Sequence, residues 1–307
     1  MIYLPIIGAS LEAIGSIIDK KIVSNKKINV KNYSVYGFLA LVIVMLIMWV
    51  LLPLVNIFIP EFKFWQLWPN YNNIDKIIIF IAIVITSVFA NLLMIYALKR
   101  EDLTVLEPIR LMQPLFTIII AFTLSFFLIE YSKENNPLLL ILAFIACLTL
   151  IISHIKKHHF DFDKFILAAL LGNFLFGLEL ALSPLLLPQF TNFYSSISFS
   201  FTFYLLRCFF IFFICLLIFR PKPNSFPKKE IIPTLIVSTI WVIFRIILYL
   251  GYSTYGVVKT TILLSVLAPI FIYILARIFL KEKLELRNII SAVIIVICVV
   301  VASIIQK

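Results

Sequence analysis

The chain has 307 residues, of which 63% are hydrophobic and only 13% are charged, and it contains 30 phenylalanines. This composition excludes an ordinary soluble domain and predicts a polytopic membrane protein. The formal net charge of +11 does not indicate nucleic-acid binding, because the Lys and Arg residues gather in loops between apolar segments, where they can contact anionic lipid.

Apolar runs of about 20 residues, separated by polar residues, predict ten membrane-spanning helices and an all-α integral membrane fold. In chain order the predicted spans are 2–19, 34–59, 74–98, 103–129, 136–155, 163–187, 194–219, 231–252, 256–280 and 286–305. No connection between them is long enough for a second, soluble domain.

A weak internal repeat divides the predicted helices into two equal sets. The sequence around Pro114 resembles the sequence around Pro269, and the two prolines are 155 residues apart, about half the chain. This predicts a first five-helix repeat over 1–158 and a second over 159–307. Because five is an odd number, the second repeat enters the membrane from the opposite side, as in the inverted repeats of many secondary carriers.

The sequence predicts neither an enzyme nor a metal or cofactor site. The four cysteines lie singly within apolar segments, and the three histidines lie near one membrane edge without a carboxylate or thiolate at ligand spacing. No glycine-rich phosphate loop or nucleophile elbow is present. We therefore expect small-molecule and lipid partners, no cofactor, no metal and no nucleic acid, in a monomer or homodimer.

Ionisable residues inside the predicted helices are the candidates for function. If each faced lipid at about 3 kcal/mol, the seven together would cost roughly 20 kcal/mol, more than the stability of a typical domain, roughly 5 to 15 kcal/mol. They must therefore face one another or a wet cavity. The seven are Glu12, Glu107, Arg110, Glu179, Arg207, Arg245 and Lys259.

Glu12 lies near the middle of the first predicted helix, at the depth of the bilayer centre. Burial disfavours a charged carboxylate, so this position suits a group that takes up and releases protons. The alternative is a permanent ion pair with an arginine of another helix. Glu179 occupies a similar depth in the sixth helix, and it either faces the interface between the halves or pairs with Arg207.

Arg245 has Trp241 one turn before it and Tyr249 one turn after it, on one helix face. A guanidinium flanked by aromatic rings suits a ligand that is partly organic and partly anionic. The alternative is an arginine locked to Glu12 or Glu179, with the rings as packing. Lys259 either contacts the ligand or extends to the membrane surface.

Three uncharged polar residues complete the candidate site. Asn91 and Tyr96 in the third helix either line a cavity or bond between helices, and Gln113 in the fourth either binds ligand or contacts a helix. In that same predicted helix, Glu107 and Arg110 are spaced to pair with each other, either at the membrane interface or as a gate.

The chain resembles the EamA-like branch of the drug/metabolite transporter superfamily. The resemblance rests on Tyr96-Ala97-Leu98, the helix prolines Pro114 and Pro269, and the acidic turns containing Glu130 and Glu282. It implies ten helices in two halves. In addition, Glu12-Ala-Ile-Gly15 followed by Lys20 is similar to the first helix of the small multidrug resistance proteins, whose glutamate binds protons and cationic drugs in alternation.

These observations predict a secondary carrier of the cytoplasmic membrane that moves a small polar or amphipathic metabolite by alternating access. The internal cations outnumber the acids, which favours an amino acid or an organic anion, with proton coupling through Glu12. The alternatives are a cationic drug exporter and a non-transporting receptor or scaffold subunit.

About 17 Lys and Arg residues lie near the odd-numbered connections and four near the others. This bias places both termini outside, whereas the resemblance implies termini inside.

Overall fold

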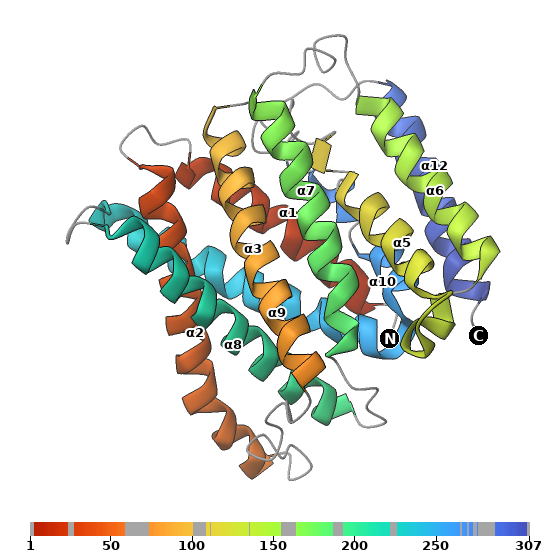
Figure 1. The fold of residues 1–307 in the computed structure, drawn as a ribbon. Coiled ribbons are helices and arrows are strands. Elements are labelled where there is room, and N and C mark those ends of the chain that lie inside the picture. The colour runs from red at the N-terminus through yellow and green to blue at the C-terminus, as the bar shows by residue number, and fades with distance from the viewer. Residues whose placement is uncertain are drawn as a thin grey trace.

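The structure is a computed structural model of the full chain. It describes residues 3–23, 28–58, 74–100, 109–110, 112–134, 136–154, 164–186, 193–221, 226–264, 266–268, 270–272, 275 and 286–305. These residues form helices joined by short turns (Figure 1).

The helices follow the apolar runs of the sequence. They are α1 (Tyr3–Val23), α2 (Val30–Phe58), α3 (Ile74–Arg100), α5 (Met112–Leu124), α6 (Pro137–His154), α7 (Lys164–Leu182), α8 (Phe193–Phe219), α9 (Ile231–Tyr255), α10 (Val257–Leu263) and α12 (Leu286–Ile305). Short 3₁₀ turns are η2 (Ile129–Glu134), η4 (Ser183–Leu185) and η5 (Lys228–Glu230). Each predicted span overlaps one of these α-helices.

Five described stretches are long and apolar enough to cross a bilayer: Val30–Leu51, Ile74–Ala97, Lys164–Leu185, Ile197–Phe219 and Lys228–Tyr255. The outer surfaces of the helices are apolar as well. Exposed residues include Ile47 on α2, Ile152 on α6, Leu217 on α8 and Ile297 on α12, which are 54% to 70% exposed. An apolar exterior around charged interior residues is the pattern expected of a bundle embedded in lipid.

Most packing contacts join helices that are distant in sequence. The most extensive contacts are those of α3 with α7, α5 with α7, α1 with α9, α2 with α8 and α6 with α12. Figure 1 shows α6 and α12 side by side at one end of the bundle, and α1 beginning and α12 ending at the same edge of the molecule. The other helices surround the charged residues.

Small residues allow two of these helix pairs to approach closely. At Gly177 on α7, a Cβ atom would lie 2.7 Å from Phe116 Cβ and 3.1 Å from the Thr117 backbone nitrogen, both on α5. At Gly251 on α9, it would lie 2.9 Å from Thr260 Oγ1 on α10. The absence of a side chain at each glycine is therefore required by the packing.

The chain reverses sharply between α9 and α10. Gly256 has a φ of 87°, a left-handed conformation that favours glycine. The carboxylate of Glu134, in η2, accepts hydrogen bonds from the backbone nitrogens of Val257 and Val258, the latter at 2.9 Å. Glu134 is only 4% exposed. This buried carboxylate therefore ties the first half of the chain to the start of α10.

Candidate functional site: a charged cavity inside the bundle

A cavity of about 200 Å³ lies among α1, α2, α3, α5, α7, α8 and α9. The candidate residues of the sequence analysis lie in the first, third, fourth, sixth, seventh, eighth and ninth predicted spans. The structure adds α2 to the lining, whereas α10, in the ninth span, contributes none of the lining residues. Among the described residues, none of those that line the cavity belongs to α6 or α12.

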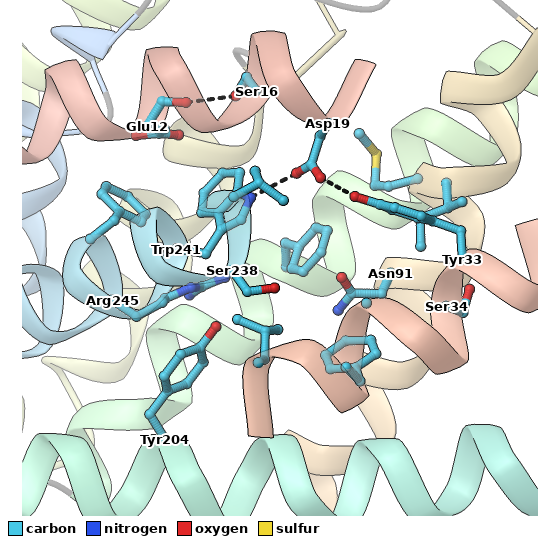
Figure 2. Close-up of a pocket in the computed structure, with 18 of the residues that line it drawn as sticks. Glu12, Ser16, Asp19, Tyr33, Ser34, Asn91, Tyr204, Ser238, Trp241 and Arg245 are labelled. Atoms are coloured by element: carbon cyan, nitrogen blue, oxygen red, sulfur yellow. Dashed lines mark hydrogen bonds between the residues drawn. The ribbon is translucent and has the colours of Figure 1, made fainter. Parts of the chain in front are cut away.

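One face of α1 supplies acidic residues to the cavity. Glu12, Ser16 and Asp19 are four and three residues apart, which places them along one side of the helix. Figure 2 shows all three on the cavity side of α1. The Ser16 hydroxyl donates to the Glu12 carbonyl oxygen at 2.8 Å and accepts a hydrogen bond from Arg110 Nη2 at 3.0 Å. Arg110 thus places a positive charge beside this acidic face.

Asp19 joins three helices, and the sequence analysis did not identify it. Its carboxylate accepts hydrogen bonds from the Tyr33 hydroxyl of α2 and from Trp241 Nε1 of α9, the latter at 2.7 Å (Figure 2). The predicted first span ended at residue 19, whereas α1 continues to Val23. The spacing of Asp19 from Glu12 and Ser16 was the signal that could have placed it in the cavity.

Glu179 and Arg207 form a buried ion pair at the inner end of the cavity. Arg207 Nη1 lies 2.6 Å from Glu179 Oε1, and Nη2 donates to Oε2 at 2.9 Å. Arg207 also donates to the Tyr249 hydroxyl at 2.6 Å and to Ser87 Oγ at 3.1 Å. These contacts agree with the ion-pair alternative for Glu179, and they make Tyr249 a partner of Arg207.

Arg245 lies beside this pair and lines the cavity. Its Nη1 is 3.7 Å from Glu179 Oε1, a distance within ion-pair range but beyond a hydrogen bond. Within the described residues, Arg245 Nη1 has no hydrogen-bond acceptor. Two guanidinium groups therefore share one carboxylate, and Arg245 holds the less complete contact.

Aromatic rings flank the guanidinium groups. Trp241 and Tyr204 both line the cavity, and the Arg207 guanidinium carbon lies 5.6 Å from the centre of the Tyr204 ring. Figure 2 shows Tyr204 and Trp241 on either side of Arg245. Such an arrangement combines positive charge with flat apolar surfaces.

The remaining predicted residues fall in different places. Asn91 and Gln113 line the cavity, and Asn91 Nδ2 donates to the Ser87 carbonyl oxygen within α3 at 2.7 Å. Tyr96 is 38% exposed and packs against Phe165 with ring centres 5.1 Å apart, because the turn of α3 that carries it faces away from the cavity.

Lys259, on α10, is buried but does not line the cavity. Glu107, the proposed partner of Arg110, lies outside the described residues, as do Glu282 and Pro269. No group of three potential metal ligands occurs among the residues that the structure describes.

The cavity holds charges of both signs. The carboxylates of Glu12 and Asp19 lie on α1 with Arg110 beside them, and the guanidiniums of Arg207 and Arg245 come from α8 and α9. A molecule in this space would meet acceptors for a cationic group and donors for an acidic group. An apolar exterior with such an interior defines a multi-pass membrane protein with an internal polar cavity as the class of protein.

Comparison with known proteins finds one family, which matches the second half of the chain. The profile of the EamA-like transporter family matches residues 163–304. This stretch is an EamA-like transporter domain, and the family is part of the drug/metabolite transporter superfamily. Proteins of this family are membrane transporters of small molecules, not enzymes, so the match of this stretch implies a multi-pass membrane transporter.

The fold is also similar to that of solved structures. A crystal structure of a protein that is 12% identical to this chain superposes on it with a TM-score of 0.64, covering 99% of both chains. At this identity the likeness concerns the fold alone. No curated protein matches the chain.

Proposed function

We propose that the protein is a secondary carrier that moves a small zwitterionic or anionic metabolite through this cavity by alternating access. In this proposal, ten helices form two inverted five-helix repeats over 1–158 and 159–307. The substrate class is inferred from Arg245. Its guanidinium lines the cavity together with the carboxylates of α1, and its Nη1 has an ion-pair contact with Glu179 but no hydrogen-bond acceptor among the described residues.

The pattern of helix contacts supports the inverted repeat. If α1, α2, α3, α5 and α6 correspond in order to α7, α8, α9, α10 and α12, exchanging the halves converts the α3–α7 contact into the α1–α9 contact. The same exchange leaves the α2–α8 and α6–α12 contacts unchanged. Two halves related in this way can exchange conformations, so that a site between them opens to one side and then to the other.

The residues of the cavity have distinct proposed roles. Arg245 binds the acidic group of the substrate, and Trp241 packs against its organic part. Glu12 binds an ammonium group or carries a coupled proton, while Asn91 and Gln113 offer hydrogen bonds. The Glu179–Arg207 pair and Tyr249 position Arg245 rather than touch the substrate, because their mutual contacts are already made.

Calorimetry with purified protein tests the substrate class. Amino acids and organic phosphates are titrated into the wild type and into the Arg245→Lys and Arg245→Ala variants. We expect binding that weakens by at least tenfold in Arg245→Ala, because an acidic group loses its charged donor. Tight binding of quaternary ammonium compounds, undiminished in Arg245→Ala and without any response to the acids, would instead establish a cation exporter.

The bias of Lys and Arg toward the odd-numbered connections supports both termini outside the cell. Asn29, an exposed residue between α1 and α2, would then face the cytoplasm. A cysteine introduced there should resist a membrane-impermeant reagent in intact cells and react after the cells are opened. Ready reaction in intact cells would place the termini inside.

A further inference from the structure

Trp241 of α9 rests against two residues of α1, Gly15 and Asp19. Its indole Nε1 donates a hydrogen bond of 2.7 Å to Asp19 Oδ2. A Cβ atom at Gly15 would lie 3.2 Å from Trp241 Cε2, the ring carbon bonded to that nitrogen, and 3.4 Å from Cζ2. Because Gly15 and Asp19 are four residues apart, they lie on the same face of α1, one turn from each other. Together they form a seat for the nitrogen-bearing side of the indole.

The Asp19 carboxylate is itself held in place from a third helix. The Tyr33 hydroxyl of α2 donates to Oδ1, so each carboxylate oxygen accepts a hydrogen bond from an uncharged ring group. Tyr33 is 7% exposed, and Trp241 packs against the same small apolar cluster to which Tyr33 belongs. Rotation of the carboxylate away from Trp241 would therefore also break its hydrogen bond to a buried tyrosine.

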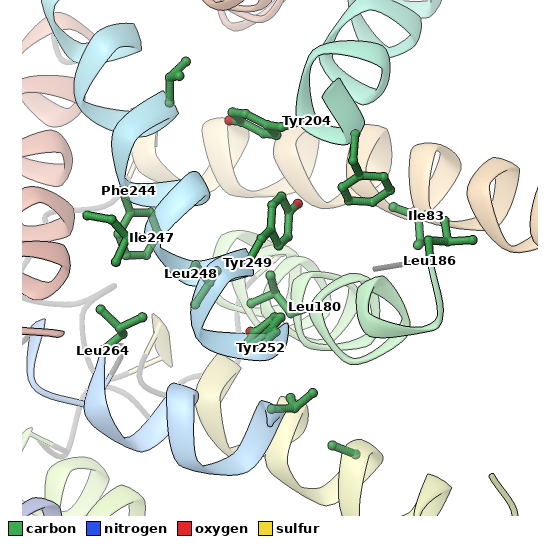
Figure 3. Packing of buried hydrophobic residues seen from close by; sticks show 14 of the residues in the cluster. Ile83, Leu180, Leu186, Tyr204, Phe244, Ile247, Leu248, Tyr249, Tyr252 and Leu264 are labelled. Atoms are coloured by element: carbon green, nitrogen blue, oxygen red, sulfur yellow. The ribbon is translucent and has the colours of Figure 1, made fainter. Parts of the chain in front are cut away.

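The seated indole forms part of the cavity wall, as do Asp19 and Tyr33. Figure 2 shows the indole nitrogen directed at Asp19, with Arg245 one turn further along α9. Phe244, which lies in the large apolar core shown in Figure 3, meets the indole edge-on, with ring centres 5.6 Å apart and an interplanar angle of 77°. Contacts from both α1 and α9 thus fix the orientation of the ring beside Arg245.

A carboxylate in the cavity wall could act on the substrate through its charge or on the protein through its geometry. Both oxygens of Asp19 already accept hydrogen bonds from the protein. Arg110, which donates to Ser16 Oγ one turn before Asp19, already supplies a positive charge nearby. An indole N–H in a protein interior normally requires such an acceptor. These observations favour the geometric role.

We propose that Asp19 is a positioning residue that holds the Trp241 ring against Gly15, so that the ring packs against the organic part of the substrate while Arg245 binds the acidic group. This role rests on the proposed function of the cavity. A ring that is already fixed loses less conformational freedom when a ligand binds, which strengthens the binding of ligands that contact it. The bond between Asp19 and Trp241 therefore favours ligands with a flat apolar group.

The indole N–H resonance of Trp241 tests this role without any ligand. Replacement of Trp49, Trp65 and Trp68 by phenylalanine leaves Trp241 as the single tryptophan. In this background, Asp19→Leu removes both acceptor oxygens at similar size. The resonance should move upfield, and acrylamide should quench the fluorescence of the ring more strongly. Asp19→Asn loses the charge but keeps one acceptor oxygen for the indole, so both signals should stay close to those of the parent.

Two glycine substitutions form a matched pair for the same measurement. Gly15→Ala places a methyl group 3.2 Å from Trp241 Cε2, so the ring must shift and its resonance should move. Gly37→Ala, on α2 in the cavity wall, meets no atom within 4 Å and should leave the resonance unchanged. Melting temperatures identify the folded variants, and Gly15→Ala tests the same contact if Asp19→Leu does not fold.

Calorimetry then measures the effect on ligands with and without a ring. Phenylalanine and phenyl phosphate are compared with alanine and inorganic phosphate. Asp19→Leu should weaken the binding of the two phenyl ligands about tenfold and that of the other two less than about twofold, whereas Asp19→Asn should resemble the wild type. In a Trp241→Phe background, which lacks the N–H group, Asp19→Leu should add no further loss, because the two residues act through one bond.

An unchanged indole resonance in both Asp19→Leu and Gly15→Ala would overturn the positioning role. Equal losses in Asp19→Asn and Asp19→Leu would also overturn it, because they would show that the charge of Asp19 is what matters. So would equal losses for ligands with and without a ring. If none of the four ligands binds to the wild type, the proposed substrate class fails, and the resonances still decide the role of Asp19.

Discussion

Arg207 and Glu179 meet in two parallel contacts between α8 and α7, with both side chains at most 3% exposed. Such a pair owes its geometry to planar donor and acceptor groups. Its removal from water is costly, and this cost offsets much of the attraction between the two charges. The pair holds Tyr249 on one side and leaves Arg245 directed at the cavity.

Breaking this pair should destabilise the protein strongly. Glu179→Gln leaves the Arg207 guanidinium buried without its counter-ion, and we expect a loss of about 3 to 5 kcal/mol in the free energy of unfolding. Chemical denaturation in detergent measures it. Glu230→Gln is the matched control, because its contact with Lys229 is 3.9 Å long and the lysine is 70% exposed. That change should cost at most about 1 kcal/mol.

Two neighbouring tyrosines should respond differently to the same substitution. Tyr249→Phe removes the acceptor of a 2.6 Å hydrogen bond from Arg207 and should cost about 1 to 3 kcal/mol of stability. Tyr252→Phe removes a hydroxyl that has no hydrogen bond among the described residues, so stability should be unchanged or slightly higher. Equal losses in both variants would contradict this difference.

Because α5 and α7 approach closely at Gly177, we expect any larger side chain at this position to destabilise the protein. Gly177→Ala would bring a methyl group within 2.7 Å of Phe116 Cβ, and we expect a loss of about 1 to 3 kcal/mol. Gly37→Ala is the control, since no atom lies within 4 Å of the added Cβ. It should stabilise α2 by about 0.5 to 1 kcal/mol, because alanine favours helix. The melting temperatures of the two variants, each compared with that of the wild type, test both expectations.

Substitution of Glu12 tests proton coupling. Glu12→Gln keeps the size of the side chain but removes its ionisation, so the dependence of uptake on pH between about 5 and 8 should flatten. Glu12→Asp retains the ionisable group and serves as the control. Transport by Glu12→Gln with an unchanged pH profile would exclude Glu12 as the proton carrier.

The apolar runs of the sequence predicted where the helices lie, because the bilayer fixes their length and polarity. The repeat around Pro114 suggested the two halves. The sequence also required that internal charges be paired, but it left the partners open, because helix rotation is set by packing across distant segments. Glu179 and Arg207 are 28 residues apart, and Ser87, a further partner of Arg207, is 120 residues away.

Two residues of the site were missed in the sequence analysis. Asp19 lies at the last position of the first predicted span, but its hydrogen bonds place it inside the bundle. Tyr204 on α8 was not expected either, since an aromatic residue in an apolar helix is indistinguishable from a packing residue by sequence alone. Its position beside the Arg207 guanidinium, seen only in the structure, identifies Tyr204 as part of the site.

The described cavity and its inner ion-pair cluster contain three carboxylates, Glu12, Asp19 and Glu179, and three guanidiniums, Arg110, Arg207 and Arg245. When all six are ionised, their charges cancel. Moving one elementary charge through a membrane potential of 100 mV involves about 2.3 kcal/mol. A balanced cavity that carries a zwitterion without a coupled proton therefore does no electrical work, and the membrane voltage leaves its transport rate unchanged, whereas a coupled proton on Glu12 would add one positive charge. An anion without a compensating proton would make the same cavity electrogenic.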